Sequence, residues 1–181
     1  MLFINACVRK ESRTKKIADA LIAKLGGEVD ELVLHEQTFP QVNEHFINKR
    51  DELKEKGSFS DSMFDFARQF ASAERIVIAA PFYDMSFPAS LKQYFELINV
   101  GGVTFTYTEE GALKGLCGAK DLYYVTTSGG PMFDEVFGFG YVKALAQNFY
   151  GIPEVKLIKA IGLDIYGADA DAIVNKAIEE L

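Results

Sequence analysis

Apolar stretches and amphipathic stretches alternate along this chain of 181 residues. Short, continuous apolar runs, such as residues 76–80, are typical of strands that are buried on both faces. Runs with an apolar residue every three or four positions, such as residues 13–25, are typical of amphipathic helices. We predict strands at residues 2–6, 29–34, 75–80, 121–127 and 155–162. We predict helices at residues 13–25, 62–73, 88–100, 137–149 and 168–181.

Five strands that alternate with helices predict an α/β fold, with a doubly wound parallel sheet and helices on both faces. Five is the strand count of the flavodoxin-like order 2-1-3-4-5, in which the ligand lies at the switch point between the first and third strands. No internal repeat or linker divides the chain, so we expect one domain over residues 1–181.

Two segments depart from this alternation. Residues 35–60 are long, polar and charged, and we expect them to carry a short helix that flanks the site. Residues 103–108 alternate like a strand, but they lie between a helix and the fourth strand. We therefore predict that residues 101–118 form a projecting arm or hairpin.

Composition restricts the class of protein. Hydrophobic residues make up 49% and charged residues 25% of the chain, as in soluble globular proteins. No apolar run approaches the roughly 20 residues that span a bilayer, so we expect no membrane insertion. The N-terminus enters a strand without the pattern of a signal peptide, which predicts a cytoplasmic protein. The two cysteines, Cys7 and Cys117, and the two histidines have no metal-ligand spacing, so no metal is expected.

The charge is unevenly distributed. The formal net charge of −7 disfavours a nucleic-acid partner. Residues 9–16 nevertheless carry five basic side chains and one acidic one. This local patch indicates either a small anionic ligand or a solvated first helical turn.

The loop after the first strand contains candidate anion-binding residues: Arg9, Ser12, Arg13 and Thr14. Hydroxyls, two guanidinium groups and the unpaired amides of a first helical turn can together bind an anion. The loop lacks the glycine pattern of a P-loop or a dinucleotide fingerprint, which favours a monophosphate. The alternative is that Ser12 or Thr14 is only a helix cap.

Two further loops follow the third and fourth strands at the same sheet edge. The first contains Pro81, Phe82, Tyr83, Asp84 and Met85, which can hold a flat, apolar-faced ligand, and a flavin is the leading candidate. Its aromatic residues could instead belong to the core. The second contains Thr127, Ser128, Gly129 and Gly130; hydroxyls can bond polar ring edges, and paired glycines allow close backbone approach. An ordinary turn is the alternative there.

Nearly the whole chain resembles the FMN-dependent NADH-azoreductases, a branch of the flavodoxin-like NAD(P)H:quinone oxidoreductases. The resemblance is carried by residues 12–14, 79–85, 91–95, 102–108 and 127–130. It implies a homodimer with FMN at two interface sites. It also implies that Arg9, Ser12, Arg13 and Thr14 hold the phosphate, that residues 81–85 line the isoalloxazine, and that residues 127–130 contact its pyrimidine end. Two positions depart from the family: Asp84 replaces the usual asparagine, and Ser128 replaces a frequent arginine.

The resemblance implies two-electron, ping-pong hydride transfer from NADH or NADPH, through FMN, to a quinone or azo substrate. Tyr107, on the predicted arm, would reach over the partner's flavin, and Tyr107 and Tyr83 are the candidates for substrate hydrogen bonding or protonation. An alternative with the same fold is a flavodoxin-type electron carrier that acts with a protein partner. A phosphoacceptor regulator is disfavoured, because it needs acidic residues at the end of the first strand, where this chain has residues 5–7, Asn-Ala-Cys.

Overall fold

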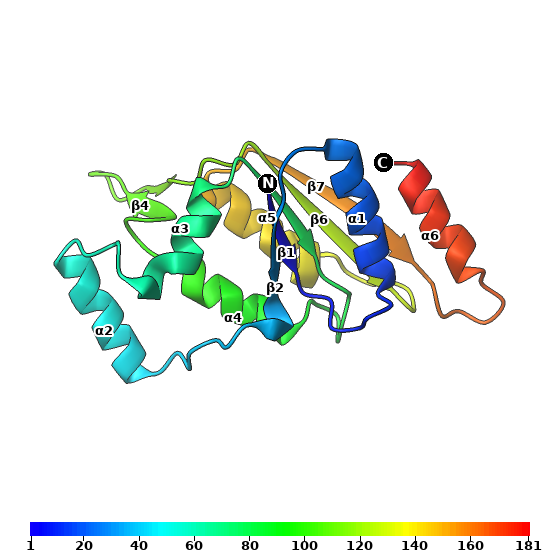
Figure 1. Ribbon diagram of the computed structural model, residues 1–181, viewed down its shortest axis with the longest axis horizontal. Helices are drawn as coiled ribbons and strands as arrows, with labels where there is room; N and C mark the ends of the chain where they lie inside the picture. The colour runs from blue at the N-terminus through cyan, green and yellow to red at the C-terminus, as the bar shows by residue number, and fades with distance from the viewer.

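The computed structural model describes residues 1–181 as a parallel sheet between two layers of helices (Figure 1). The sheet has the order β2-β1-β3-β6-β7, and every pair in it is parallel. Its strands are β1 (Leu2–Asn5), β2 (Asp30–Val33), β3 (Arg75–Ala79), β6 (Asp121–Ser128) and β7 (Glu154–Ile161). Counted along the chain, this is the predicted order 2-1-3-4-5, so the predicted fold class is confirmed.

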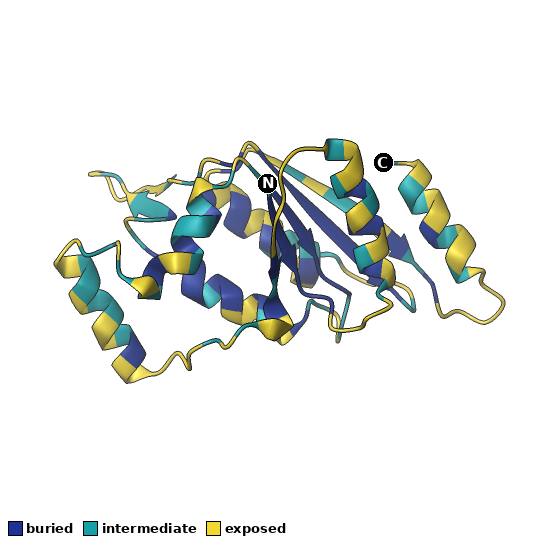
Figure 2. Cartoon of the chain, viewed as in Figure 1, coloured by how far each residue is buried: buried dark blue, intermediate teal, exposed yellow.

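Helices cover both faces because each face of the sheet is apolar. Residues Phe3, Val77 and Val125 pack against α1 (Arg13–Leu25) and α6 (Ala170–Glu179). The opposite face packs against α3 (Asp65–Ser72), α4 (Ala89–Ile98) and the helical segment at residues 136–150. Figure 2 shows the central strands β1, β3 and β6 almost entirely in the colour of buried residues. No helix has the length and apolar character needed to cross a membrane.

The two irregular segments form the short helix and the hairpin that their patterns predict, but Figure 1 shows residues 44–55 at the end of the molecule away from α1, so this helix does not flank the predicted site at the start of α1. The short 3-10 helix η1 (Leu34–Glu36) overlaps the start of residues 35–60, which also contain α2 (Glu44–Glu55). The 3-10 helix η2 (Ser62–Phe64) then leads into α3. The predicted arm is an antiparallel hairpin of β4 (Phe105–Tyr107) and β5 (Leu113–Gly115). Both α2 and the hairpin are largely exposed or half-buried (Figure 2).

The predicted helix at residues 137–149 is less regular than its pattern suggests. It consists of a π-helical segment η3 (Val136–Gly140), one α-turn α5 (Tyr141–Ala144) and a second π-helical segment η4 (Leu145–Tyr150). It ends at Gly151, which has a positive φ of 74°. π-Helical turns are rare and occur mostly at functional sites, and η3 lies next to the loop that follows β3.

Candidate active site at the carboxyl edge of the sheet

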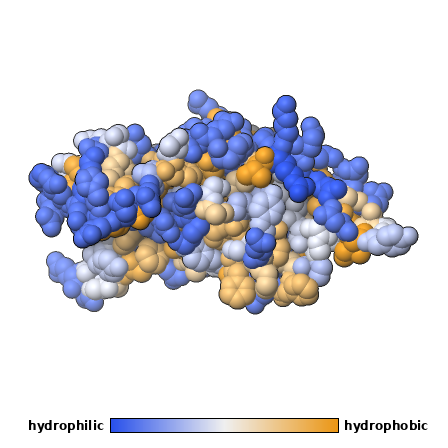
Figure 3. Space-filling view, turned by 90° about the horizontal axis from the view of Figure 1, so that it is seen from below, coloured by the Kyte–Doolittle hydropathy of each residue, from blue (hydrophilic) through white to orange (hydrophobic).

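The carboxyl ends of the parallel strands meet at one edge, and a cleft of about 400 Å³ opens there. Residues of all three predicted loops line this cleft: Arg9, Ser12, Arg13, Thr14, Pro81, Phe82, Tyr83, Thr127 and Gly129. Figure 3 views the molecule from this side, and its middle is coloured from white to orange beside the hydrophilic surface at the left. The structure therefore brings most of the predicted site residues together.

The first loop leaves hydrogen-bond donors free at the start of α1. Ser12 caps the helix, because its hydroxyl oxygen accepts from the amide of Lys15 at 3.2 Å. The amides of Arg13 and Thr14 have no hydrogen-bond partner within the chain. With the positive end of the helix dipole and the arginines at 9 and 13, they form a site suited to a phosphate.

A buried pair of hydroxyls connects the first loop to the third. The Oγ1 atoms of Thr14 and Thr127 lie 2.6 Å apart, and both side chains are buried. This hydrogen bond fixes the start of α1 against the end of β6, so the two loops keep a constant separation across the cleft.

The second loop forms a two-residue turn at the rim. The amide of Phe82 donates to the carbonyl of Thr127 at 3.0 Å, which extends the pairing of β3 with β6. Tyr83 and Ser86 exchange backbone hydrogen bonds of 2.9 and 2.7 Å. Between them Asp84 and Met85 have φ values of 49° and 66°, so both central residues are left-handed. Both are exposed and lie outside the lining of the cleft, whereas Tyr83 lines it.

The third loop is fixed by a residue that the sequence pattern did not indicate. The side chain of Asp164, in the loop after β7, accepts from Arg13 at 2.8 Å, and its amide donates to the carbonyl of Gly129 at 2.8 Å. A side chain on Gly129 would collide with the Asp164 carboxylate. The hydroxyl of Ser128 donates to the carbonyl of Gly130 at 2.8 Å, so this hydroxyl is engaged within its own turn.

Glu11 and Leu163 also line the cleft and were not predicted. For Leu163, the signal that could have indicated it was its position, because residues 162–164 directly follow the fifth strand at the same edge of the sheet.

Tyr107 does not lie in this cleft. It is on β4, it is 62% exposed, and its ring packs edge-on against Phe105 with centroids 5.9 Å apart. Figure 1 shows β4 well apart from α1, whose first turn lines the cleft. Within one chain, therefore, Tyr107 and the cleft are separate.

Burial keeps the thiol next to the first loop protonated. Desolvation raises the pKa of Cys7 to about 11, although a hydrogen bond with Ser12 and the charge of Lys15 act in the opposite direction. A thiol with such a pKa is neutral at physiological pH and is a poor nucleophile. The site therefore contains no activated cysteine.

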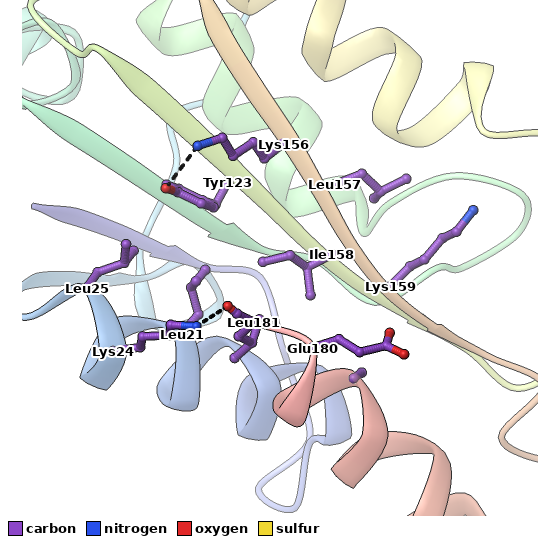
Figure 4. A pocket seen from close by; sticks show the side chains of 11 residues that line it. Leu21, Lys24, Leu25, Tyr123, Lys156, Leu157, Ile158, Lys159, Glu180 and Leu181 are labelled. Atoms are coloured by element: carbon purple, nitrogen blue, oxygen red, sulfur yellow. Dashed lines mark hydrogen bonds between the residues drawn. The ribbon is translucent and has the colours of Figure 1, made fainter.

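A larger cavity of about 750 Å³ lies elsewhere, between the ends of α1 and α6 and the strands β6 and β7 (Figure 4). Its wall is mainly apolar, and Lys156 donates to the hydroxyl of Tyr123 at 3.5 Å across it. It contains none of the predicted site residues and no helix N-terminus. The smaller cleft is the candidate functional site, because it combines free amides, guanidinium groups and the carboxyl edge of the sheet, and the larger cavity does not.

The fold and this cleft define a flavodoxin-like α/β protein whose candidate site lies at the switch point of its sheet. The profile of the Flavodoxin_2 family, described as a flavodoxin-like fold, matches residues 1–181. This chain therefore belongs to that family.

Curated relatives cover almost the whole chain. It is 36% identical over 193 aligned residues to "FMN-dependent NADH:quinone oxidoreductase 2" of Clostridium acetobutylicum, covering 99% of this chain and 94% of the relative. It is 37% identical over 186 residues to the "FMN-dependent NADH:quinone oxidoreductase" of Coprothermobacter proteolyticus, covering 94% and 89%. Among solved structures, an azoreductase from Bacillus anthracis superposes with a TM-score of 0.83 at 25% identity, covering 99% of this chain and 94% of that one. The resemblance stated from the sequence is confirmed.

Proposed function

We propose that this protein is an FMN-dependent oxidoreductase that uses NADH or NADPH to reduce quinones, azo compounds or both. One observation carries the proposal: a cleft at the switch point of the sheet joins two free amides and two arginines to the aromatic side chains of Phe82 and Tyr83. A flavin mononucleotide has the matching parts, a phosphate at one end and a flat ring at the other. The names of the relatives from Clostridium and Coprothermobacter support the same cofactor and the same donor.

The residues present fit FMN in charge and in size. Its phosphate would be held by the amides of Arg13 and Thr14 and by the guanidinium groups at 9 and 13. The cleft of about 400 Å³ lies within the roughly 300–1,000 Å³ of ordinary cofactor sites. Phe82 would line one side of the ring, and the backbone at Gly129 can approach it without a side chain between them.

Bound FMN would supply the two-electron redox chemistry, accepting a hydride from the nicotinamide and passing it to the substrate. The chain itself would bind and orient the FMN and shield it from water. The hydrogen bond between Thr14 and Thr127 holds the part of the cleft that would bind the phosphate against the part that would bind the ring. The hydroxyl of Tyr83 has no partner within the chain, so it can donate a proton or a hydrogen bond to a substrate oxygen or nitrogen.

We further propose that the site is completed by a second copy of the chain. Large apolar side chains are exposed along the carboxyl edge, in the loops and first helical turns: Val8, Met85, Phe133, Val136, Phe137, Ile165 and Tyr166. Exposed apolar residues gathered at one edge indicate a surface that another molecule covers. The exposed Tyr107, far from its own cleft, would then lie over the cofactor of the partner.

We place this reaction in the cytoplasm, where nicotinamide donors are made. Both cysteines are free in the structure, which suits a reducing compartment.

The test is a visible spectrum of the purified protein with added FMN, followed by anaerobic NADH and then a quinone. Binding, bleaching by NADH and many turnovers without a partner protein support the enzyme, whereas a bound flavin that NADH cannot bleach supports the electron carrier. Arg9→Ala should weaken FMN binding, and Lys10→Ala is the matched control, because Lys10 neighbours Arg9 but lies outside the cleft. Equal affinities of the two variants would contradict the assigned phosphate site.

The shared site is tested by mixing two inactive variants. One carries Tyr107→Phe, and the other carries Arg9→Ala with Arg13→Ala. A mixed dimer pairs one intact cofactor loop with one intact arm, so part of the activity should return on mixing. Full activity of Tyr107→Phe alone, or a monomer by analytical ultracentrifugation, would contradict this part of the proposal.

A further inference from the structure

The turn at the rim of the cleft is held in an unfavourable backbone conformation. Asp84 and Met85 have φ values of 49° and 66°. Left-handed backbone is tolerated by glycine and, to a lesser degree, by asparagine and aspartate, but methionine has no such aptitude. Residues in such conformations persist only where surrounding contacts hold them.

The two sides of the turn are anchored, but its tip is not. On one side the amide of Phe82 is bonded to β6. On the other side the ring of Phe87 packs against Phe95 and Tyr141, with centroids 5.9 and 5.6 Å apart. Between these anchors the turn is closed only by the two backbone bonds between Tyr83 and Ser86, and a small isolated hairpin of this kind is marginal in water.

A single side-chain hydrogen bond connects this tip to the rest of the protein. The hydroxyl of Ser86 donates to the carbonyl of Phe137 at 2.6 Å. Phe137 belongs to the π-helical segment η3, so the bond joins the turn to the first turn of the helix after β6. The bond is exposed, and its acceptor is a backbone atom of η3.

We propose that Ser86 is a positioning residue: its hydroxyl clamps the strained Asp84–Met85 turn to η3 and thereby fixes the backbone of the loop that would line the flavin. This inference rests on the proposed function for its consequence, but the clamp itself is a property of the chain alone. Removing the hydroxyl leaves a turn whose preferred state is to open. Opening moves Tyr83, which lines the cleft.

Hydrogen exchange on the protein without FMN tests the clamp directly. The amides of Tyr83 and Ser86 both donate within the turn, so their protection reports its closed state. Ser86→Ala should reduce their protection roughly 3- to 10-fold, the range expected for one lost hydrogen bond. Ser86→Thr, which keeps the hydroxyl, should retain protection near that of the wild type.

A second pair of variants separates backbone strain from side-chain contacts. In the Ser86→Ala background, Met85→Gly relieves the left-handed strain and should restore protection. Met85→Ala removes the same side chain but keeps the strain, so it should restore nothing. Unchanged protection in Ser86→Ala, equal loss in Ser86→Thr, or equal rescue by glycine and alanine would each overturn the proposal.

The consequence for the cofactor is measured by fluorescence titration with FMN. Ser86→Ala should raise the dissociation constant roughly 3- to 10-fold, and Met85→Gly should reverse this rise. A loss of affinity without a change in exchange would overturn the proposal, because the hydroxyl would then act directly. A wild-type protein that binds no FMN would refute the proposed function, while the exchange comparison would still decide on the clamp.

Discussion

The β4–β5 arm is fixed to the body of the protein at Gly115, and replacing this glycine by alanine tests that attachment. A Cβ atom on Gly115 would collide with backbone atoms of both Tyr150 and Gly151, at the end of the helix after β6. Backbone atoms cannot rotate away as a side chain can. The arm or the helix end must therefore move if the substitution is to be accommodated.

Contacts where the arm joins the body of the protein make such movement energetically unfavourable. The hydroxyl of the fully buried Thr104 donates to the carbonyl of Ile98 at 2.7 Å, and the ring of Phe105 packs on Phe149 with centroids 5.1 Å apart. Overpacking a well-packed site costs about 1–3 kcal/mol, and a collision with backbone belongs at the upper end, near about 3 kcal/mol. For a domain of this size each kcal/mol lowers the thermal midpoint by about 2–4 °C, so we expect a fall of about 6–12 °C.

Gly118→Ala is the matched control for this measurement. A Cβ atom on Gly118 would meet its nearest neighbour, the carbonyl oxygen of Ala71, at 3.5 Å, which is ordinary contact. Both variants change the unfolded chain in the same way, so the difference between their melting curves by circular dichroism isolates the collision. A midpoint of Gly115→Ala within about 2 °C of Gly118→Ala would refute the rigid attachment. If Tyr107 serves the partner's site, Gly115→Ala should also reduce quinone turnover more than it reduces FMN binding.

Three further predictions concern the cleft and the loops around it. Asp164→Asn should tighten FMN binding about 3- to 10-fold at low salt, because the substitution removes a carboxylate near the phosphate. The same substitution should lower the free energy of unfolding by under about 1 kcal/mol, because Arg13, the partner of Asp164 in the ion pair, is 45% exposed. Weaker binding in a fluorescence titration would show instead that Asp164 positions Arg13. Asp84→Asn should shift the potential of bound flavin by only about 10 mV, because Asp84 is exposed and outside the cleft lining. A shift several times larger in a redox titration would show that its charge acts on the flavin. Burial raises the pKa of Cys7 from 9.0 in the unfolded chain to about 11, so the neutral thiol contributes about 2–3 kcal/mol to the free energy of unfolding below pH 9.0, and this contribution is lost as the pH rises to about 11. In urea unfolding, Cys7→Ala should therefore lose less stability between these pH values than the wild type does. An unchanged dependence of stability on pH would contradict the burial argument.

Much of the fold was predictable because the strands and the helices have different patterns of hydrophobic residues. The short apolar runs of β1 and β3 are typical of strands covered on both faces, and the alternation of strand and helix patterns left few topologies. The helix after β6 was predicted as regular, but its two π-helical segments depend on tertiary packing. Spacing along a sequence does not distinguish an α-turn from a π-turn.

The candidate site was predictable as loops but not as contacts. Parallel strands place their carboxyl ends at one edge, so residues following β1, β3 and β6 had to be neighbours. Which side chains meet there depends on turn geometry. Ser128 turns its hydroxyl to Gly130, while its neighbour Thr127 faces Thr14 across the sheet edge. Adjacent strand residues point to opposite faces, so only one of the two could join the cleft.

Asp164 illustrates why some contact residues of the candidate site could not be predicted from the sequence. It follows a strand at the edge of the sheet, and a lone acidic residue near an expected phosphate reads as unfavourable. In the structure it contacts the first loop through Arg13 and the third loop through the backbone of Gly129. Its charge opposes an anion while its contacts hold together the two loops that would bind one, and these two effects have opposite signs in the affinity for FMN. The site is therefore built from coupled loops, and the contribution of any one residue depends on which loops it joins.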